Sequence, residues 1–211
     1  MKKRLATGLL AAALLFGTLP TAALAAEGER GGLTIAPRPE NVTIAPKPAD
    51  RVTRSMAVSR LWELSGRPQV DAVLQFTDVT AGSKEAEAIR WASAAGITAG
   101  YTDAWFGGGD AVTREQLAAM IYRFVQRYDM GFRGAWMFYL GCEDLQEVQD
   151  WAMEPMYWMV ASRLYDGSAD VLLRPRDAVT AEELEAVLSG LQKEAERKNV
   201  DFTAVPTAAE Q

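Results

Sequence analysis

The sequence predicts an all-α fold built from helix-loop-helix repeats, and three observations favour this class. Apolar side chains recur at helical spacing after the run of glycines at 107–109. Thr113 and Gln116 form a capping-box pattern just before this stretch, which marks the start of a helix. The same order of helix, loop and helix then returns along the chain at fixed offsets, as expected for a repeat architecture.

The clearest repeat spans residues 72–135. Its second helix is predicted to begin after Thr113 and to carry an apolar stripe formed by Leu117, Met120, Ile121 and Phe124. Its first helix has an apolar face formed by Ile89, Trp91, Ala92 and Ala95. We expect this helix to end at Gly96, where glycine supplies a left-handed cap.

Two further repeats are recognised by their offsets from this one. Residues 51–71 look like the second half of a repeat, because Val52-Thr53-Arg54 matches the sequence sixty positions later. Residues 142–191 look like a degenerate repeat. Four of its residues match residues of the middle repeat that lie 67 positions earlier, namely Trp158, Leu164, Gly167 and Thr180. Its Thr180 and Glu183 predict a second capping box, and Ala181 stands where an arginine is expected. Residues 192–211 are predicted to be a polar helix end followed by a disordered tail.

The start of the chain has the pattern of an exported protein. Residues 1–25 show a charged start, an apolar core and a small-x-small cleavage site, which are typical of a secretory signal peptide. The alternative is an uncleaved membrane anchor, although the apolar run is short for one. Residues 26–50 are a proline-rich linker with a small tandem repeat, which is either a semi-rigid spacer or a binding motif.

Composition excludes several functions. The net charge is −6, and an acidic protein is a poor general binder of nucleic acid or of an anionic membrane. The chain has no histidine, so it lacks the commonest general base and the commonest metal ligand. Its one cysteine, Cys142, is best explained as a small buried hydrophobe. We therefore expect no enzymatic activity, no cofactor, no metal, and no membrane span after processing.

An aromatic stretch follows the middle repeat at residues 129–141. It contains Phe132, Trp136, Phe138 and Tyr139. The stretch is either a linker packed against the helices or an exposed patch for a partner.

Arg54 and Arg114 are unusual because each is expected just inside a helix N-terminus. The helix dipole disfavours a cation there by roughly 0.3–1 kcal/mol. Combined with the free N–H groups of the first turn, a guanidinium group forms a good receptor for a carboxylate or a phosphate. The alternative is an ion pair with an acidic residue of a neighbouring repeat.

Three segments together resemble the S-layer homology (SLH) family. They are Phe76-Thr77-Asp78-Val79, the loop from Gly100 through Tyr101, Asp103 and Trp105 to Phe106, and the helix start Thr113-Arg114-Glu115-Gln116. The resemblance implies two and a half units packed as a pseudo-threefold bundle, because one unit alone cannot bury its apolar stripe. The sequence departs from the family at Lys84-Glu85 and at Ala104-Trp105, and in the lost arginine of the third repeat.

The resemblance also implies a function. SLH domains bind anionic cell-wall polysaccharides, typically pyruvylated, in grooves between repeats. By this resemblance Arg54 and Arg114 pair with the anion, and Asp103 and the backbone of Gly100 contact hydroxyl groups. Trp105 stacks on a sugar, and Thr113 and Tyr101 line the groove. For Tyr101, Trp105 and Phe106, packing in the core is the alternative role.

We therefore expect a secreted protein associated with the cell wall or S-layer, anchored noncovalently through secondary cell-wall polysaccharide. Other envelope proteins are possible partners. The alternative is a secreted protein–protein interaction or structural module that keeps the SLH fold without binding polymer. A glycoside hydrolase requires two facing carboxylates, and no recognisable motif supplies them.

Overall fold

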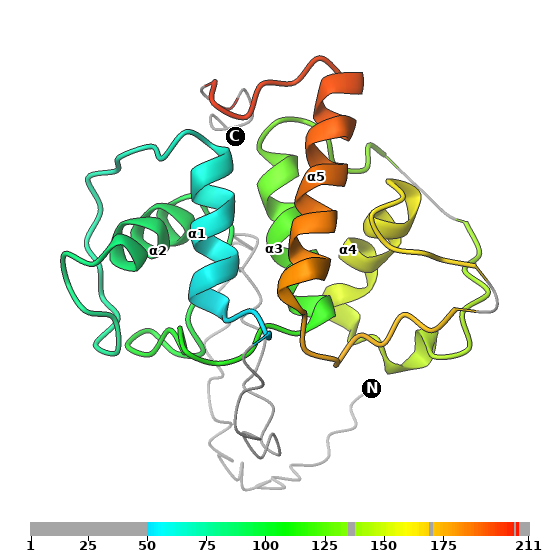
Figure 1. Ribbon diagram of the computed structural model, residues 1–211, viewed down its shortest axis with the longest axis horizontal. Helices are drawn as coiled ribbons and strands as arrows, with labels where there is room; N and C mark the ends of the chain where they lie inside the picture. The colour runs from blue at the N-terminus through cyan, green and yellow to red at the C-terminus, as the bar shows by residue number, and fades with distance from the viewer. Residues whose placement is uncertain (1–49, 135–137, 169–170, 205, 207–211) are drawn as a thin grey trace, which may run out of the picture. The chain divides into compact units, whose positions relative to one another are not determined.

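The computed structural model describes residues 50–134, 138–168, 171–204 and 206, all within the compact unit Leu33–Gln211. These residues contain α-helices and isolated β-bridges but no strand, which confirms the all-α class (Figure 1). The predicted signal peptide and most of the linker lie outside the described residues. The elements are α1 (Arg54–Leu64), α2 (Lys84–Ala94), α3 (Arg114–Gln126), the 3-10 turn η1 (Leu145–Glu147), α4 (Asp150–Ala161) and α5 (Ala181–Arg197).

Consecutive repeats interlock through their helices. Helix α2, the first helix of the middle unit, packs against α1 of the unit before it. In the same way α4, the first helix of the third unit, packs against α3 of the middle unit. The predicted stripe of α3 is buried, with Leu117, Ile121 and Phe124 fully shielded from solvent. Burying each such side chain contributes roughly 1.5–3 kcal/mol. The core is therefore shared between units, as the repeat pattern predicts.

Threonine caps three helices in the same manner. The side-chain oxygens of Thr53, Thr113 and Thr180 each accept the N–H of the residue three positions on. At Thr113 the box is complete, because Gln116 Oε1 also accepts the Thr113 N–H at 3.3 Å. At Thr180 only this first half is observed, since the Glu183 carboxylate forms an ion pair with Arg114. The prediction of a second capping box at Thr180 and Glu183 was therefore only half correct.

The residues before these three helices form a closed ring of backbone hydrogen bonds. Val52 N donates to Val179 O at 2.9 Å, Val179 N donates to Val112 O at 3.0 Å, and Val112 N donates to Val52 O at 3.0 Å. All three valines are fully buried. The ring holds the starts of α1, α3 and α5 together, and the three helices leave it in the same general direction (Figure 1).

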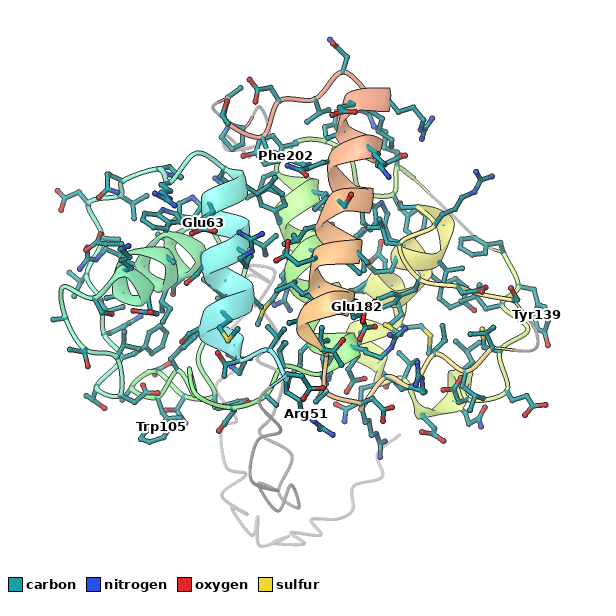
Figure 2. The ribbon with its side chains drawn as sticks, viewed as in Figure 1. Arg51, Glu63, Trp105, Tyr139, Glu182 and Phe202 are labelled. Carbon is teal, nitrogen blue, oxygen red and sulfur yellow. The ribbon has the colours of Figure 1, made fainter. Side chains whose placement is uncertain are left out.

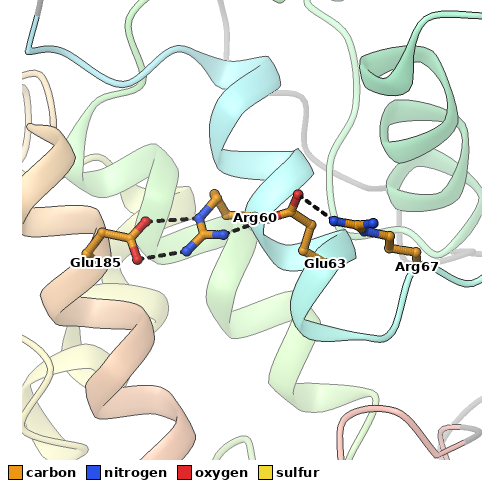
Figure 3. Close-up of polar contacts among 4 residues, drawn as sticks. All are labelled: Arg60, Glu63, Arg67 and Glu185. Atoms are coloured by element: carbon orange, nitrogen blue, oxygen red, sulfur yellow. Dashed lines mark hydrogen bonds and ion pairs between the residues drawn. The ribbon is translucent and has the colours of Figure 1, made fainter.

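A surface arginine also joins the first unit to the third (Figure 3). Arg60 of α1 donates from Nε and Nη2 to the two carboxylate oxygens of Glu185 on α5, at 2.9 and 2.7 Å. Its Nη1 donates to Glu63 at 2.6 Å. Because these side chains are well exposed, the pair links the two helices but adds little stability.

Residues 198–204, part of the segment predicted as a disordered tail, are described by the structure. Helix α5 continues to Arg197, and Phe202 beyond it is buried. The Phe202 ring lies 4.9 Å from that of Phe124 and 5.0 Å from that of Tyr128. This packing was not predicted from the sequence, because one aromatic residue in a polar segment gives no periodic signal.

The aromatic stretch at 129–141 is partly packed. The ring of Phe132 packs against that of Tyr122, with 6.2 Å between the ring centres, and the ring of Phe138 packs against that of Tyr157, with 5.1 Å between the centres. Tyr139 is 90% exposed, and Trp136 lies outside the described residues. In the part of the chain that the structure describes, no helix has both the length and the apolar character needed to cross a membrane.

Candidate functional site

The loop between α2 and α3 is fixed by a carboxylate and a glycine. Asp78 accepts the N–H groups of Phe106 and Gly107, both at 2.8 Å. At Gly100 a β-carbon would lie 2.5 Å from the carbonyl oxygens of Thr102 and Trp105. Only glycine allows this close approach of backbone to backbone. The loop is therefore a preformed receptor for a side chain from a neighbouring unit.

Arg54 is the side chain that enters this loop. It is only 3% exposed, and its Nη2 donates to Ala99 O at 2.8 Å and its Nε to Phe106 O at 3.2 Å. Its guanidinium carbon lies 4.5 Å from the centre of the Tyr101 ring. Burial lowers the pKa of Arg54, although the group remains charged. Arg54 thus joins the first unit to the second.

Arg114 makes the corresponding contact with the third unit. Its Nε donates to Leu173 O at 2.7 Å, and its guanidinium carbon lies 4.1 Å from the centre of the Tyr165 ring. It also forms an ion pair with Glu183 of α5, and burial lowers its pKa. This contact includes the ion pair with a neighbouring repeat that the sequence offered as the alternative.

Three residues of this second junction were not predicted from the sequence. Asp144 accepts the N–H groups of Leu173 and Arg174 at 2.8 and 2.6 Å, as Asp78 does in the middle unit. Tyr165 supplies the ring beneath Arg114, and its hydroxyl donates to Arg114 O at 3.2 Å. The third is Glu183. The equivalence of Asp144 to Asp78 was detectable in the sequence, since Cys142-Glu143-Asp144-Leu145 aligns with Phe76-Thr77-Asp78-Val79 at an offset of 66.

The remaining predicted residues lie in two places. Gly100 and Tyr101 form the loop that holds Arg54, whereas Thr113 caps α3 at the next junction. Asp103 and Trp105 lie on the outer turn of the loop and are exposed, and Figure 2 shows Trp105 at the periphery of the described part. The structure therefore does not gather all seven predicted residues into one site.

A small crevice opens beside Arg54, lined by residues of α1, α3 and α4 and of the loop that precedes α3. Its volume is about 20 Å³, enough for about one water molecule. Arg54 and Arg123 both line it, and no carboxylate is among the lining residues. Burial lowers the pKa of Arg123. The lining residues are Arg54, Thr98, Ala99, Gln116, Ala119, Met120, Arg123 and Trp151.

The chemistry of this crevice suits an anion. Two guanidinium groups supply positive charge and N–H donors. Trp151 adds an amphipathic ring to the lining, and Trp151 Nε1 donates to Gln149 Oε1 at 2.6 Å. Among the residues that the structure describes, no cluster of three or more metal-binding side chains is found.

A buried carboxylate lies near the start of α4. Glu115 is 4% exposed, and its Oε2 accepts the Gln149 N–H at 3.2 Å. Burial raises the pKa of Glu115, which outweighs the opposing effects of this hydrogen bond and of Arg176. Glu115 thus satisfies a backbone group at a helix start that has no side-chain cap of its own.

Comparison with known proteins identifies the central part of this architecture. Residues 75–118 match the family model of the S-layer homology domain. The chain therefore carries an S-layer homology domain, which confirms the resemblance at the segment containing Asp78, the Arg54-binding loop and the start of α3.

Two curated relatives share part of this sequence. Both are described as outer membrane protein SlpA of Thermus thermophilus, and each is 42% identical over 55 residues. The match covers 26% of this chain and 6% of each relative, so the chain spans only a small part of their length.

Proposed function

We propose that this protein is exported and anchors noncovalently to a bacterial cell envelope by binding an anionic, pyruvylated secondary cell-wall polysaccharide. The S-layer homology domain and the similarity to an outer membrane protein support the envelope location. The observation that carries the binding proposal is the crevice that Arg54 and Arg123 both line, with no carboxylate among its lining residues. An anion there meets two cations in a partly desolvated place, where electrostatic attraction is stronger than in water.

The size of the crevice defines what enters it. A space of about 20 Å³ accepts part of a carboxylate group but not a sugar ring. In this proposal the carboxylate of the polymer points inward, and the sugar that bears it stays at the mouth. Arg123 and Trp151 line the crevice and are both half-buried, and in this proposal they contact the carboxylate and the sugar face.

The predicted residues take different parts in this proposal. Arg54 lines the crevice while its hydrogen bonds hold the loop. A ligand role for Arg114 requires Glu183 to be displaced. Asp103 and Trp105, being exposed, supply outer contacts to an extended polymer. Gly100, Tyr101 and Thr113 support the site through loop and cap geometry.

The closed valine ring supports the proposal that the units pack around a pseudo-threefold axis. We propose that the protein acts as an adaptor or structural component and has no enzymatic activity. The polymer and neighbouring envelope proteins are its proposed partners.

One observation favours the alternative of an interaction or structural module without polymer binding. Both helix-start arginines are committed to junctions between units, where they donate to backbone carbonyls. Their presence at helix starts is therefore explained without any ligand. The crevice beside Arg54 is what distinguishes the two functions.

Sedimentation with purified cell walls separates these proposals. The mature protein is incubated with walls that retain their secondary polysaccharide and with walls stripped of it. Polymer anchoring predicts that the protein sediments with intact walls and stays in solution with stripped walls. Equal retention by both preparations, or by neither, would contradict it and support the alternative.

A further inference from the structure

A second cavity lies at the C-terminal ends of α1, α2 and α3. The residues that cap these ends are Ser65, Ala95 and Arg127, and all three line the cavity, which we call the C-cap pocket. Its volume is about 290 Å³, at the lower end of the roughly 300–1,000 Å³ of small-molecule pockets. Arg54 and Arg114 begin α1 and α3, so the C-cap pocket lies at the other ends of these two helices.

Aromatic rings form part of the lining of the C-cap pocket. The ring of Phe124 packs against those of Trp91, Tyr128 and Phe202, with 6.3, 5.2 and 4.9 Å between ring centres. The last three of these residues line the pocket. The Tyr128 hydroxyl also donates to Phe202 O at 2.7 Å, which joins the chain after α5 to the end of α3. Because these rings belong to the core, the pocket is preformed and offers apolar surface to a ligand.

Trp91 brings an unused hydrogen-bond donor to the C-cap pocket. It is 5% exposed, yet among the described residues none accepts a hydrogen bond from its Nε1. The other buried tryptophans of the described part differ, since Trp62 Nε1 donates to Pro68 O at 2.9 Å and Trp158 Nε1 donates to Met130 O at 3.0 Å. A buried indole N–H usually has an acceptor. The nitrogen of Trp91 is not fully enclosed, and the cavity that this residue lines is the C-cap pocket.

The other polar side chains of the lining already have partners in the protein. The hydroxyl groups of Ser65, Tyr128 and Thr203 each donate to a protein oxygen. Arg127 Nη1 donates to Ala95 O at 3.0 Å. The indole N–H of Trp91 is therefore the buried donor that a ligand satisfies.

The charges around the C-cap pocket largely offset one another. Arg127 supplies one positive charge, and no carboxylate is among the lining residues. Three helix C-termini meet at the pocket, and each is equivalent to about half a negative charge. Neither an anion nor a cation then gains enough attraction to compensate for its lost hydration. The lining therefore favours an uncharged ligand.

We propose that the C-cap pocket binds a small uncharged molecule that has an aromatic or aliphatic body and one carbonyl oxygen, which accepts the N–H of Trp91. The body packs on the rings of Tyr128 and Phe202, and burial of its apolar surface supplies most of the affinity. This site is separate from the crevice beside Arg54, so it adds a second ligand to the polymer of the proposed function.

Two probes that differ in charge test this proposal. Naphthalene-2-carboxamide has the carbonyl oxygen and no charge, whereas naphthalene-2-carboxylate has the same body and a negative charge. Binding is followed by NMR at the indole N–H resonances of Trp91 and Trp158. Ala94→Leu fills the pocket from the exposed last residue of α2. Ala161→Leu is the matched control, because Ala161 is the exposed last residue of α4.

The amide is expected to shift the Trp91 resonance in a saturable manner and to leave that of Trp158 in place. The carboxylate should bind at least tenfold more weakly. Ala94→Leu should weaken binding of the amide at least tenfold, while Ala161→Leu leaves it unchanged. Trp91→Phe, which removes the donor but keeps a ring, should weaken it about threefold or more.

Three results would overturn the proposal. An unshifted Trp91 resonance at saturating amide would show that the pocket does not take this class of ligand. Equal or tighter binding of the carboxylate would contradict the preference for an uncharged molecule. Unchanged binding in Ala94→Leu, with the variant as stable as the unaltered protein, would place the amide outside the C-cap pocket.

Discussion

The Nη2 atom of Arg54 lies 2.8 Å from the carbonyl oxygen of Ala99, a residue 45 positions further along the chain. The contact joins two repeats through a charged group that is almost fully buried. A guanidinium group is suited to this task because its donors point in several fixed directions from one plane. The helix-start arginine is therefore first a connector between units, and any role in ligand binding builds on that position.

Replacing Arg54 is expected to weaken the fold. Arg54→Met leaves the carbonyls of Ala99 and Phe106 without their donor, and we expect the free energy of unfolding to fall by about 2–4 kcal/mol. Urea denaturation measures this change. Arg67→Met, on a side chain that is 63% exposed, is the control and should alter stability by about 0.5 kcal/mol or less. Equal effects of the two substitutions would contradict the connector role.

Asp78 and Asp144 are predicted to act as equivalent loop anchors. Each carboxylate accepts two backbone N–H groups, so Asp78→Ala and Asp144→Ala should each cost about 1–3 kcal/mol of unfolding free energy. Chemical denaturation of both single variants measures these losses. A near-neutral Asp144→Ala beside a destabilising Asp78→Ala would show that the third unit does not depend on its anchor.

Glu115 is expected to make stability fall as pH rises. Its pKa is raised by burial, so the folded protein holds a proton on Glu115 at pH values where the unfolded chain has lost it. The free energy of unfolding therefore decreases from about pH 4.5, the ordinary pKa of the group, up to its folded pKa. Glu115→Gln keeps an acceptor for Gln149 N–H but cannot titrate.

The test is the difference in unfolding free energy between Glu115→Gln and the unaltered protein, measured from pH 4 to 8. We expect the substitution to become progressively more favourable as pH rises through this window and then to level off. A difference that does not vary with pH, or that varies in the opposite sense, would show that Glu115 is not destabilised by burial.

The Arg60–Glu185 pair should contribute only a small coupling. Its geometry is bidentate, but the side chains are 41% and 57% exposed, so solvent screens the attraction. A double-mutant cycle with Arg60→Ala and Glu185→Ala, read by denaturation, should give about 0.2–1 kcal/mol. A coupling well above about 2 kcal/mol would mean that this contact helps to hold the first and third units together.

Much of the fold was predictable from periodic and capping signals. The apolar stripe of α3, the cap at Thr113 and the left-handed Gly96 are each local patterns, and the structure confirms them. The contacts that join units were harder to foresee. Tyr165 lies under Arg114 although no loop pattern places a tyrosine there, and Glu183 was assigned to its own helix cap. Side-chain partners across a junction depend on packing, which local sequence does not encode.

The candidate site was likewise only partly predictable from the sequence. The loop residues and Arg54 were identified by motif, but the motif carries no information about which atoms remain open to a ligand. Arg123 and Trp151 come from α3 and α4 and line the crevice only because those helices meet there. No spacing rule in the sequence relates them to Arg54.

The affinity of the purified secondary polysaccharide for the Arg123→Gln variant is the most direct test of polymer binding. Arg123 lines the crevice, whereas Arg67→Gln changes an exposed arginine elsewhere and serves as the control. Isothermal titration at neutral pH should show binding at least tenfold weaker for Arg123→Gln, with the control unchanged and both variants as stable as the unaltered protein. Unchanged affinity in Arg123→Gln would contradict the claim that the anion is held in this crevice.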